Sequence, residues 1–211
     1  MERAAAAGLS AIALTDHDTI AGVAAATTAG DRLGVRVIGG CEFSVAAPWG
    51  EMHVLGYFLP ADSPELDSFL ERCRTDRRRR ASEMVQKLQA AGVVITDADV
   101  LAIAGTGAVG RPHVARAIVA AGAARDVNDA FDRFLGRHRP AYVDKALPAF
   151  REVADLTHSV GGIVSAAHLK DRASRPVLER FRSEGLDAVE VRHPSHSPDH
   201  RARLTGLARA L

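Results

Sequence analysis

The stretch Ile12-Ala13-Leu14-Thr15-Asp16-His17-Asp18 begins as a short apolar strand and ends in a cluster of ionisable side chains. A buried strand has no packing reason to end on three such groups in a row, whereas strand ends of this kind line the rims of active sites. Two further apolar stretches deliver Glu42 and His53 in the same way. Imidazole nitrogen and carboxylate oxygen are suitable ligands for divalent metals. The pattern therefore predicts a metal site built from His17, Glu42 and His53.

The composition is that of an ordinary globular protein. Its 211 residues are 47% hydrophobic and 25% charged, and Lys+Arg 27 against Asp+Glu 26 leaves a formal net charge of +1. No global field therefore favours nucleic acid or an anionic membrane, and any anion recognition must be local. No apolar run approaches the roughly 20 residues that span a bilayer. We expect a cytoplasmic protein without a membrane partner.

The order of predicted elements divides the chain into three parts. Residues 1–62 alternate strand, helix and strand, and then form a hairpin that brings Glu42 towards His53. Within this part we expect a helix over 19–33, with Asp18 or Thr19 as its N-cap. Residues 63–147 carry only helical spacing and read as an inserted lid or substrate lobe. Residues 148–211 return to α/β order, which is typical of a parallel sheet or barrel.

Several segments, in order along the chain, carry the resemblance to a known family. They are Leu14-Thr15-Asp16-His17-Asp18-Thr19, Gly39-Gly40-Cys41-Glu42-Phe43-Ser44, Glu51-Met52-His53-Val54-Leu55-Gly56, Gly110-Arg111-Pro112-His113, Ala166-Ala167-His168 and Ala188-Val189-Glu190-Val191. Together they resemble the PHP (polymerase and histidinol phosphatase) family, and most of all its stand-alone metal-dependent phosphoesterases. Those enzymes act on nucleoside 3′,5′-bisphosphates and short oligonucleotide ends.

The resemblance implies an α/β fold, a distorted (βα)7 TIM-like barrel with an all-helical insertion. It also implies two or three divalent ions (Mn, Zn, Fe or Mg) at the carboxyl ends of the strands. By position, His17 would be a terminal ligand and Glu42 a bridging carboxylate, while His53 and His168 would hold a second ion. Asp16 and Asp18 would orient His17, and Asp16 enters our candidate catalytic set.

Substrate-binding candidates come from two further places. Arg111 and His113 follow a glycine-rich loop at the start of a predicted helix, and free backbone N–H groups there favour phosphate. A plain N-terminal cap is the alternative. His193 and His196 lie in a proline-containing loop after the strand at 188–191, on the same rim. We expect His193 to contact substrate and His196 to contact phosphate or carry a proton.

The chain departs from the family pattern at both ends. The His-x-His pair of the first strand and the terminal Asp-x-His are absent from the sequence, and Leu169 stands where the family usually has proline. We therefore expect an incomplete barrel, fewer than three metals and little or no turnover by this chain, and we expect phosphate release that depends on Glu42 and His53 from a parent protein that carries both motifs. The strand at 10–15 would also be left as an unpaired edge, which predicts self-association.

Three functions remain open from the sequence. The first is a phosphoesterase that hydrolyses nucleotide-type esters with a metal-activated water. The second is a catalytically dead remnant or binding module, and the third is a histidinol-phosphatase-like phosphomonoesterase. The run Arg77-Arg78-Arg79-Arg80 covers a full helical turn, so we expect most of it to lie in solvent. Trp49, at a turn beside the predicted site, is either packing or a base-stacking residue.

Overall fold

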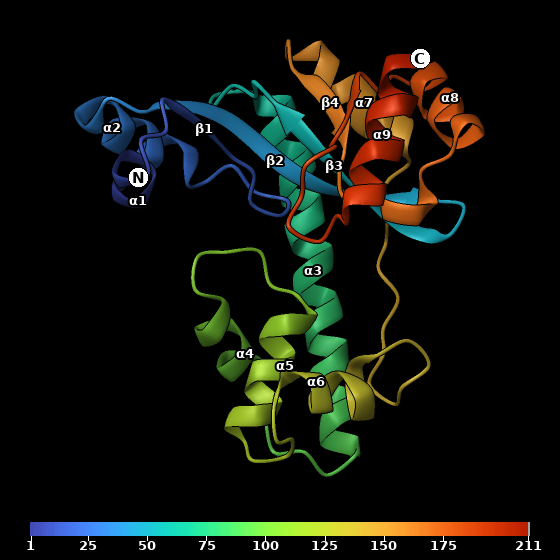
Figure 1. Ribbon diagram of the computed structural model, residues 1–211. Coiled ribbons are helices and arrows are strands. Elements are labelled where there is room, and N and C mark those ends of the chain that lie inside the picture. Colours follow the sequence, from blue (N-terminus) through green and yellow to red (C-terminus); the bar gives the residue numbers. More distant parts are fainter. Residues whose placement is uncertain (211) are drawn as a thin grey trace. The chain divides into compact units, whose positions relative to one another are not determined.

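The computed structural model describes residues 1–210 and divides into two compact units (Figure 1). The first unit combines Met1–Ser68 with the chain from Leu147 onward, and the second comprises Phe69–Ala146. No helix among the described residues has both the length and the apolar character needed to cross a bilayer. All strands belong to the first unit.

The first unit is built on a five-stranded mixed sheet in the order β1-β2-β3-β4-β5. Its strands are β1 (Ala11–Leu14), β2 (Arg36–Ala47), β3 (Gly50–Tyr57), β4 (Ile163–Ala166) and β5 (Ala188–Val189). β1 runs parallel to β2 and β4 parallel to β5, while β3 is antiparallel to both β2 and β4. The expected α/β character and the β2–β3 hairpin are confirmed. Within residues 1–210 the sheet is open, with β1 and β5 at its edges.

The α-helices that lie wholly in this unit are α1 (Glu2–Ala6), α2 (Val23–Leu33), α7 (Phe150–Ser159), α8 (Arg175–Ser183) and α9 (Pro198–Ala210). α2 packs on β2, and α7 packs on β2 and β4. The rings of Phe150 and Phe181 lie 4.8 Å apart and join α7 to α8. Buried Phe43, Val45 and Val54 complete this apolar core, which fixes the strands that carry the candidate site.

The second unit is helical. α3 (Pro64–Ala90) begins in the first unit and continues into the second, where α4 (Asp97–Ala104), α5 (Arg111–Ala120), α6 (Val127–Ala130) and a π-helical turn (Phe131–Leu135) follow. Leu88, Val114, Ile118 and Leu135 are fully buried in its core.

The expectation for the arginine run is only half right. Arg80 is 6% exposed, and its Nε donates to the carbonyl of Val143 at 2.8 Å. Arg77 is 9% exposed and donates to the carbonyl of Val109 at 3.3 Å. Only Arg78 and Arg79 lie in solvent. The guanidinium groups of Arg77 and Arg80 thus each donate a hydrogen bond to a backbone carbonyl, as a buried charge requires.

The predicted start of the helix over 19–33 is wrong. α2 begins at Val23 with Gly22 as its N-cap, and neither Asp18 nor Thr19 caps it. The chain at Asp18 instead remains beside β2, because its N–H donates to the carbonyl of Glu42 at 3.1 Å. β2 runs without a break through Gly39, where an added Cβ would lie 2.5 Å from the carbonyl oxygen of Leu59. Glycine at this position therefore permits a close approach of two backbone segments.

Candidate metal centre

The β1–β2 ladder places His17 beside Glu42. Leu14 pairs with Gly39 in the regular ladder, and His17 pairs with Glu42 in an isolated parallel bridge with the same offset along the chain. Two backbone hydrogen bonds of 3.1 Å hold the bridge, from Asp18 N–H to the Glu42 carbonyl and from Glu42 N–H to the Asp16 carbonyl. The strand thus resumes its pairing after a short gap, at the residue that carries the imidazole.

The hairpin and β4 bring two more imidazoles to the same place. Glu42 pairs with Leu55 and Ser44 pairs with His53, so Glu42 and His53 are diagonal neighbours on one face of the hairpin. The N–H of Ala167 donates to the carbonyl of His53 at 3.1 Å, just beyond the end of β4. This bond sets the next residue, His168, beside His53.

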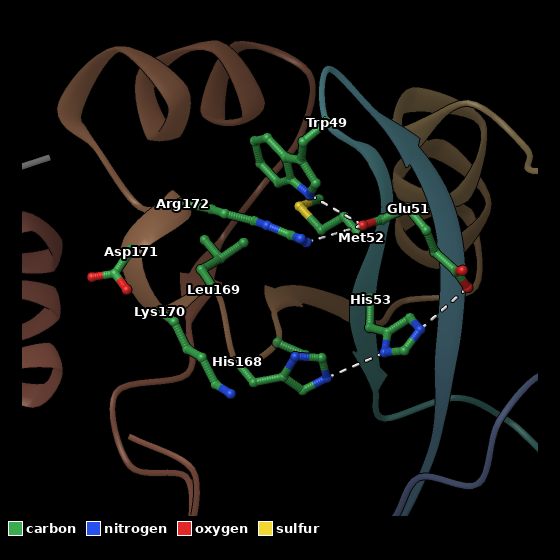
Figure 2. A pocket seen from close by; sticks show the side chains of 10 residues that line it. Trp49, Glu51, Met52, His53, His168, Leu169, Lys170, Asp171 and Arg172 are labelled. Atoms are coloured by element: carbon green, nitrogen blue, oxygen red, sulfur yellow. Dashed lines mark hydrogen bonds and ion pairs between the residues drawn. The ribbon is translucent and has the colours of Figure 1, made fainter. Parts of the chain in front are cut away.

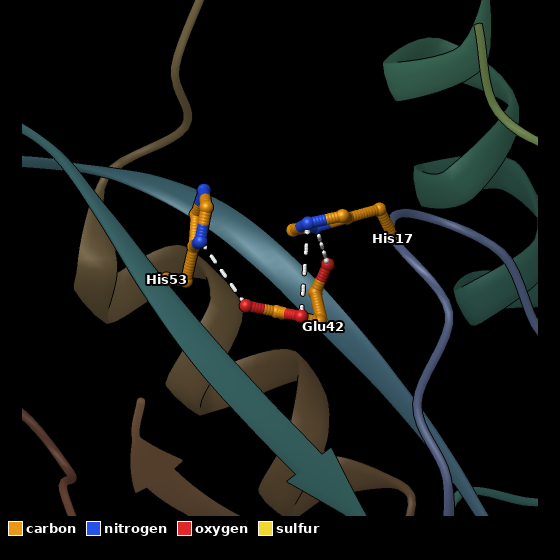
Figure 3. A group of neighbouring side chains, drawn as sticks. All are labelled: His17, Glu42 and His53. Carbon is orange, nitrogen blue, oxygen red and sulfur yellow. Dashed lines mark hydrogen bonds and ion pairs between the residues drawn. The ribbon is translucent and has the colours of Figure 1, made fainter. Parts of the chain in front are cut away.

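The Glu42 carboxylate lies at the centre of the cluster (Figure 3). Its Oε2 is 3.7 Å from His17 Nε2, and its Oε1 is 3.1 Å from both His53 Nδ1 and His168 Nε2. His53 Nδ1 and His168 Nε2 are themselves 3.2 Å apart. One carboxylate oxygen thus faces one imidazole and the other oxygen faces two.

The electrostatics of the cluster couple Glu42 to its imidazoles. Burial would raise the pKa of Glu42, but hydrogen bonds from His168 and His53 and the charge of His17 hold it well below its usual range. Burial would lower the pKa of His53, but hydrogen bonds to Glu42 and Glu51 and their charges raise it to about 9. Without a metal, His53 therefore holds a proton at neutral pH and pairs with an ionised Glu42.

The donor set fits a divalent metal. One ligand atom each from His17, Glu42 and His53 lies within 4.8 Å of the other two. Two ligands about 2.1 Å from a common ion are about 3.0–3.4 Å apart at right-angled to tetrahedral geometry. The nitrogen-to-oxygen distances of 3.1 and 3.7 Å around Glu42 are close to that range. An ion could therefore replace the proton of His53 with small side-chain movements.

Two acidic residues without a predicted role support these imidazoles. Glu51 Oε1 is 3.3 Å from His53 Nε2, so Glu51 can accept from the ring nitrogen that faces away from Glu42. A carboxylate on the distal nitrogen of a metal-bound histidine fixes its tautomer and raises its basicity. Glu190 Oε2 accepts from the backbone N–H of His168 at 2.8 Å. Both lie in the motifs quoted above, and the two-residue spacing of Glu51 and His53 on one strand was a usable signal.

The other rim candidates lie in the same unit. Asp16 is exposed and contributes its carbonyl oxygen to the bridge, and its carboxylate has no hydrogen bond to a described residue. The rings of His168 and His193 are 5.3 Å apart, and those of His193 and His196 are 5.6 Å apart. His196 is 3% exposed, with Nδ1 2.9 Å from the carbonyl of Val191. Its buried Nε2 has no hydrogen-bond partner in the described part of the chain.

Arg111 and His113 belong to the second unit, at the start of α5. The Gly110 N–H donates to His113 Nδ1 at 3.0 Å, so the proton of a neutral His113 ring lies on Nε2. Burial and the charges of Arg116 and Arg77 lower the pKa of His113. The guanidinium carbon of Arg111 lies 5.8 Å from the ring centre of Phe131 and 5.9 Å from that of Tyr142. The cap and the aromatic rings thus hold both side chains in place.

Curated relatives of similar sequence include a nucleotide phosphatase and an exoribonuclease. The chain is 31% identical over 207 residues to a 3′,5′-nucleoside bisphosphate phosphatase of Chromobacterium violaceum. This alignment covers 94% of this chain and 72% of the relative. It is 30% identical over 216 residues to the 5′-3′ exoribonuclease Rnm of Escherichia coli. That alignment covers 99% of this chain and 74% of the relative.

A solved structure and a family model agree with these relatives. A Bifidobacterium adolescentis protein assigned as a metal-dependent phosphoesterase superposes with a TM-score of 0.89 at 32% identity, over 99% of this chain and 76% of the other. The family model described as the PHP domain matches residues 1–195. The resemblance inferred from the motifs is therefore confirmed, and the chain belongs to the PHP domain family.

Proposed function

We propose that this protein is a metal-dependent phosphoesterase that hydrolyses nucleotide-type phosphate esters, namely nucleoside 3′,5′-bisphosphates or short oligonucleotide ends. The observation that carries the proposal is the Glu42 carboxylate, whose two oxygens face His17 on one side and His53 and His168 on the other. The activities of two relatives, a bisphosphate phosphatase and an exoribonuclease, support the substrate class.

In this proposal Glu42 and His17 would hold one ion, and Glu42, His53 and His168 would hold a second. Mn, Zn, Fe and Mg all suit a mixed nitrogen and carboxylate set. A pair of such ions supplies a water of lowered pKa and neutralises the phosphate oxygens. Glu51 keeps His53 oriented so that Nδ1 faces the ion, and Glu190 fixes the backbone of His168.

The remaining site residues take roles around the phosphate. His193 contacts the substrate, and the unpartnered Nε2 of His196 carries a proton to or from the reacting oxygens. Asp16 supports His17 through the bridge to Glu42. Arg111 and His113, in the inserted helical lobe of residues 63–147, bind a phosphate at the start of α5. In sequence, this lobe separates the two barrel parts, 1–62 and 148–211. We also propose that the open sheet is part of a distorted (βα)7 barrel.

The test is phosphate release from adenosine 3′,5′-bisphosphate by the Mn²⁺-loaded protein. Glu42→Ala and His53→Ala are each expected to lower the rate by at least about 10², because each removes a metal ligand. Glu65→Ala, which removes an exposed carboxylate at the start of α3, is the matched control and should retain the wild-type rate. Wild-type rates in both ligand variants would contradict the metal assignment.

A nucleotide-binding module is the second candidate. It is favoured by the small ligand set, because the described residues contain one cluster of three metal-ligating groups whose ligand atoms all lie within 4.8 Å of one another. A module of this kind would bind the bisphosphate and Mn²⁺ but release no phosphate with Mn²⁺, Zn²⁺, Fe²⁺ or Mg²⁺. The same assay, run beside a binding measurement, separates the two functions.

A further inference from the structure

A pocket with a volume of about 490 Å³ opens beside the imidazole cluster (Figure 2). Trp49 and Met52 of the β2–β3 hairpin form one wall, and Leu169, Lys170 and Arg172 form the other. His53 and His168 also line it, so the pocket continues from the candidate metal centre. Pockets that hold small molecules have volumes of roughly 300–1,000 Å³. This one therefore has room for the part of a substrate that extends beyond the reacting phosphate.

Most of the charges around the pocket are already paired. Glu51 contacts His53 Nε2 at 3.3 Å, and Asp171 contacts His200 at 3.1 Å and Arg203 at 3.4 Å. The guanidinium carbon of Arg172 lies 5.5 Å from the ring centre of Trp49.

Lys170 is different. Lys170 is an exposed residue at the pocket, and its ammonium makes no hydrogen bond or ion pair with any of residues 1–210. An unpaired cation beside a predicted phosphate-binding centre favours a second anionic group on the substrate.

The backbone is strained where the lysine is presented. His168 has φ of +34° and Lys170 has φ of +50°, a region that residues other than glycine rarely adopt. Leu169 between them is 4% exposed and fills the core. Such conformations are energetically costly and cluster at functional sites. Here the strain lets two residues on either side of a buried leucine both face the pocket.

We propose that Lys170 binds a second, unreacted phosphate of the substrate, and that the apolar wall of Trp49, Met52 and Leu169 takes its sugar and base. The inference rests on the proposed phosphoesterase function and refines it. It makes the protein selective for nucleotides with two phosphates, whether a nucleoside bisphosphate or a dinucleotide with a terminal phosphate, over nucleotides with one.

The sequence supplies a reporter for this pocket, because Trp49 is the only tryptophan. Adenosine 3′,5′-bisphosphate, a 5′-phosphorylated adenine dinucleotide, adenosine 5′-monophosphate and adenosine are titrated into the metal-free protein. Trp49 emission is followed, and calorimetry provides a second measurement. We expect the bisphosphate to bind at least about tenfold more tightly than the monophosphate, the size of one charge-assisted contact. The titration with the dinucleotide shows whether the pocket binds a ligand in which one of the two phosphates joins two nucleosides.

Substitutions at Lys170 test whether its positive charge causes the preference for the bisphosphate. Lys170→Ala is expected to bind bisphosphate and monophosphate equally, and Lys170→Arg to restore most of the preference. Arg32→Ala removes an exposed cation from the end of α2, outside the pocket, and should bind like the wild type. A bisphosphate preference that survives Lys170→Ala overturns the proposal, as does bisphosphate binding that neither emission nor calorimetry detects at millimolar concentration.

The two proposals fail separately. If the Mn²⁺-loaded protein releases phosphate and Lys170→Ala keeps the wild-type ratio of kcat/KM for bisphosphate over monophosphate, the lysine subsite is wrong and the metal centre stands. If no metal gives turnover but Lys170→Ala still abolishes the preference in binding, the lysine subsite stands and the phosphoesterase assignment is wrong.

Discussion

Divalent metal should bind this protein about ten times more tightly for each unit by which the pH rises between 7 and 9. His53 can ligate an ion only after it loses its proton, and contacts with Glu42 and Glu51 raise its pKa to about 9. At pH 7 about one ring in a hundred is therefore neutral in the metal-free protein. Metal affinity at pH 7 should be about 10² below its value at high pH, and it should level off above pH 9.

Metal affinity rises with pH because the metal-free fold raises the pKa of His53. A raised pKa means that the metal-free fold retains the proton, so the ion must displace it and acid opposes binding. Calorimetric titration with Mn²⁺ at pH 8, in two buffers that differ in ionisation enthalpy, should report release of about one proton per ion. His53→Asn removes this ligand, so its remaining affinity should be weaker and independent of pH between 8 and 9.

His158→Asn is the matched control. His158 pairs with Asp187 at 2.8 Å and has no contact with the Glu42 cluster among the described residues. This variant should keep both the wild-type affinity and the proton release. Wild-type affinity that stays constant from pH 7 to 9, or an unchanged slope in His53→Asn, would refute the coupling of His53 to Glu42.

Three further predictions test the supporting structure. Glu51→Ala should weaken Mn²⁺ binding by about 10- to 100-fold in a chelator competition, because it removes the acceptor on His53. Ile118→Ala should cost about 2–5 kcal/mol in urea unfolding because the side chain is fully buried, whereas Val94→Ala, at a side chain that is 89% exposed, should change stability by less than about 0.5 kcal/mol. Thr157→Val should leave stability equal or higher, because the Thr157 hydroxyl is buried without a hydrogen-bond partner in the described region. A loss of more than about 1 kcal/mol in Thr157→Val would show that this hydroxyl is bonded.

The sequence was informative where chemistry and strand pattern coincide. His17, Glu42 and His53 each stand out because an ionisable residue lies on or after an apolar strand, and the hairpin between residues 41 and 58 could be expected from its turn. Their convergence follows from ladder geometry, since neighbouring strands bring residues of the same register together. The family motifs also marked His168, which the structure brings to within 3.1 Å of Glu42.

The rest depends on contacts between distant segments. Asp18 does not cap α2 because its side-chain Oδ1 accepts from the backbone N–H of Ser44, 26 residues later in the sequence. Arg77 and Arg80 are buried because carbonyls at Val109 and Val143 accept their hydrogen bonds. Lys170 gave no signal, since only its left-handed backbone brings it to the pocket. Local propensity contains none of this information.

The constant register between β1 and β2 means that the position of His17 beside Glu42 does not depend on the length of α2. It does depend on the number of residues between Leu14 and His17. α2 joins these strands on the outside of the ladder, so an evolving sequence could gain or lose a helical turn there without shifting His17 against Glu42. One residue inserted between Leu14 and His17 would instead rotate the imidazole to the opposite face of the strand. Homologous chains should therefore vary in α2 length while keeping a fixed three-residue step from the end of β1 to the histidine.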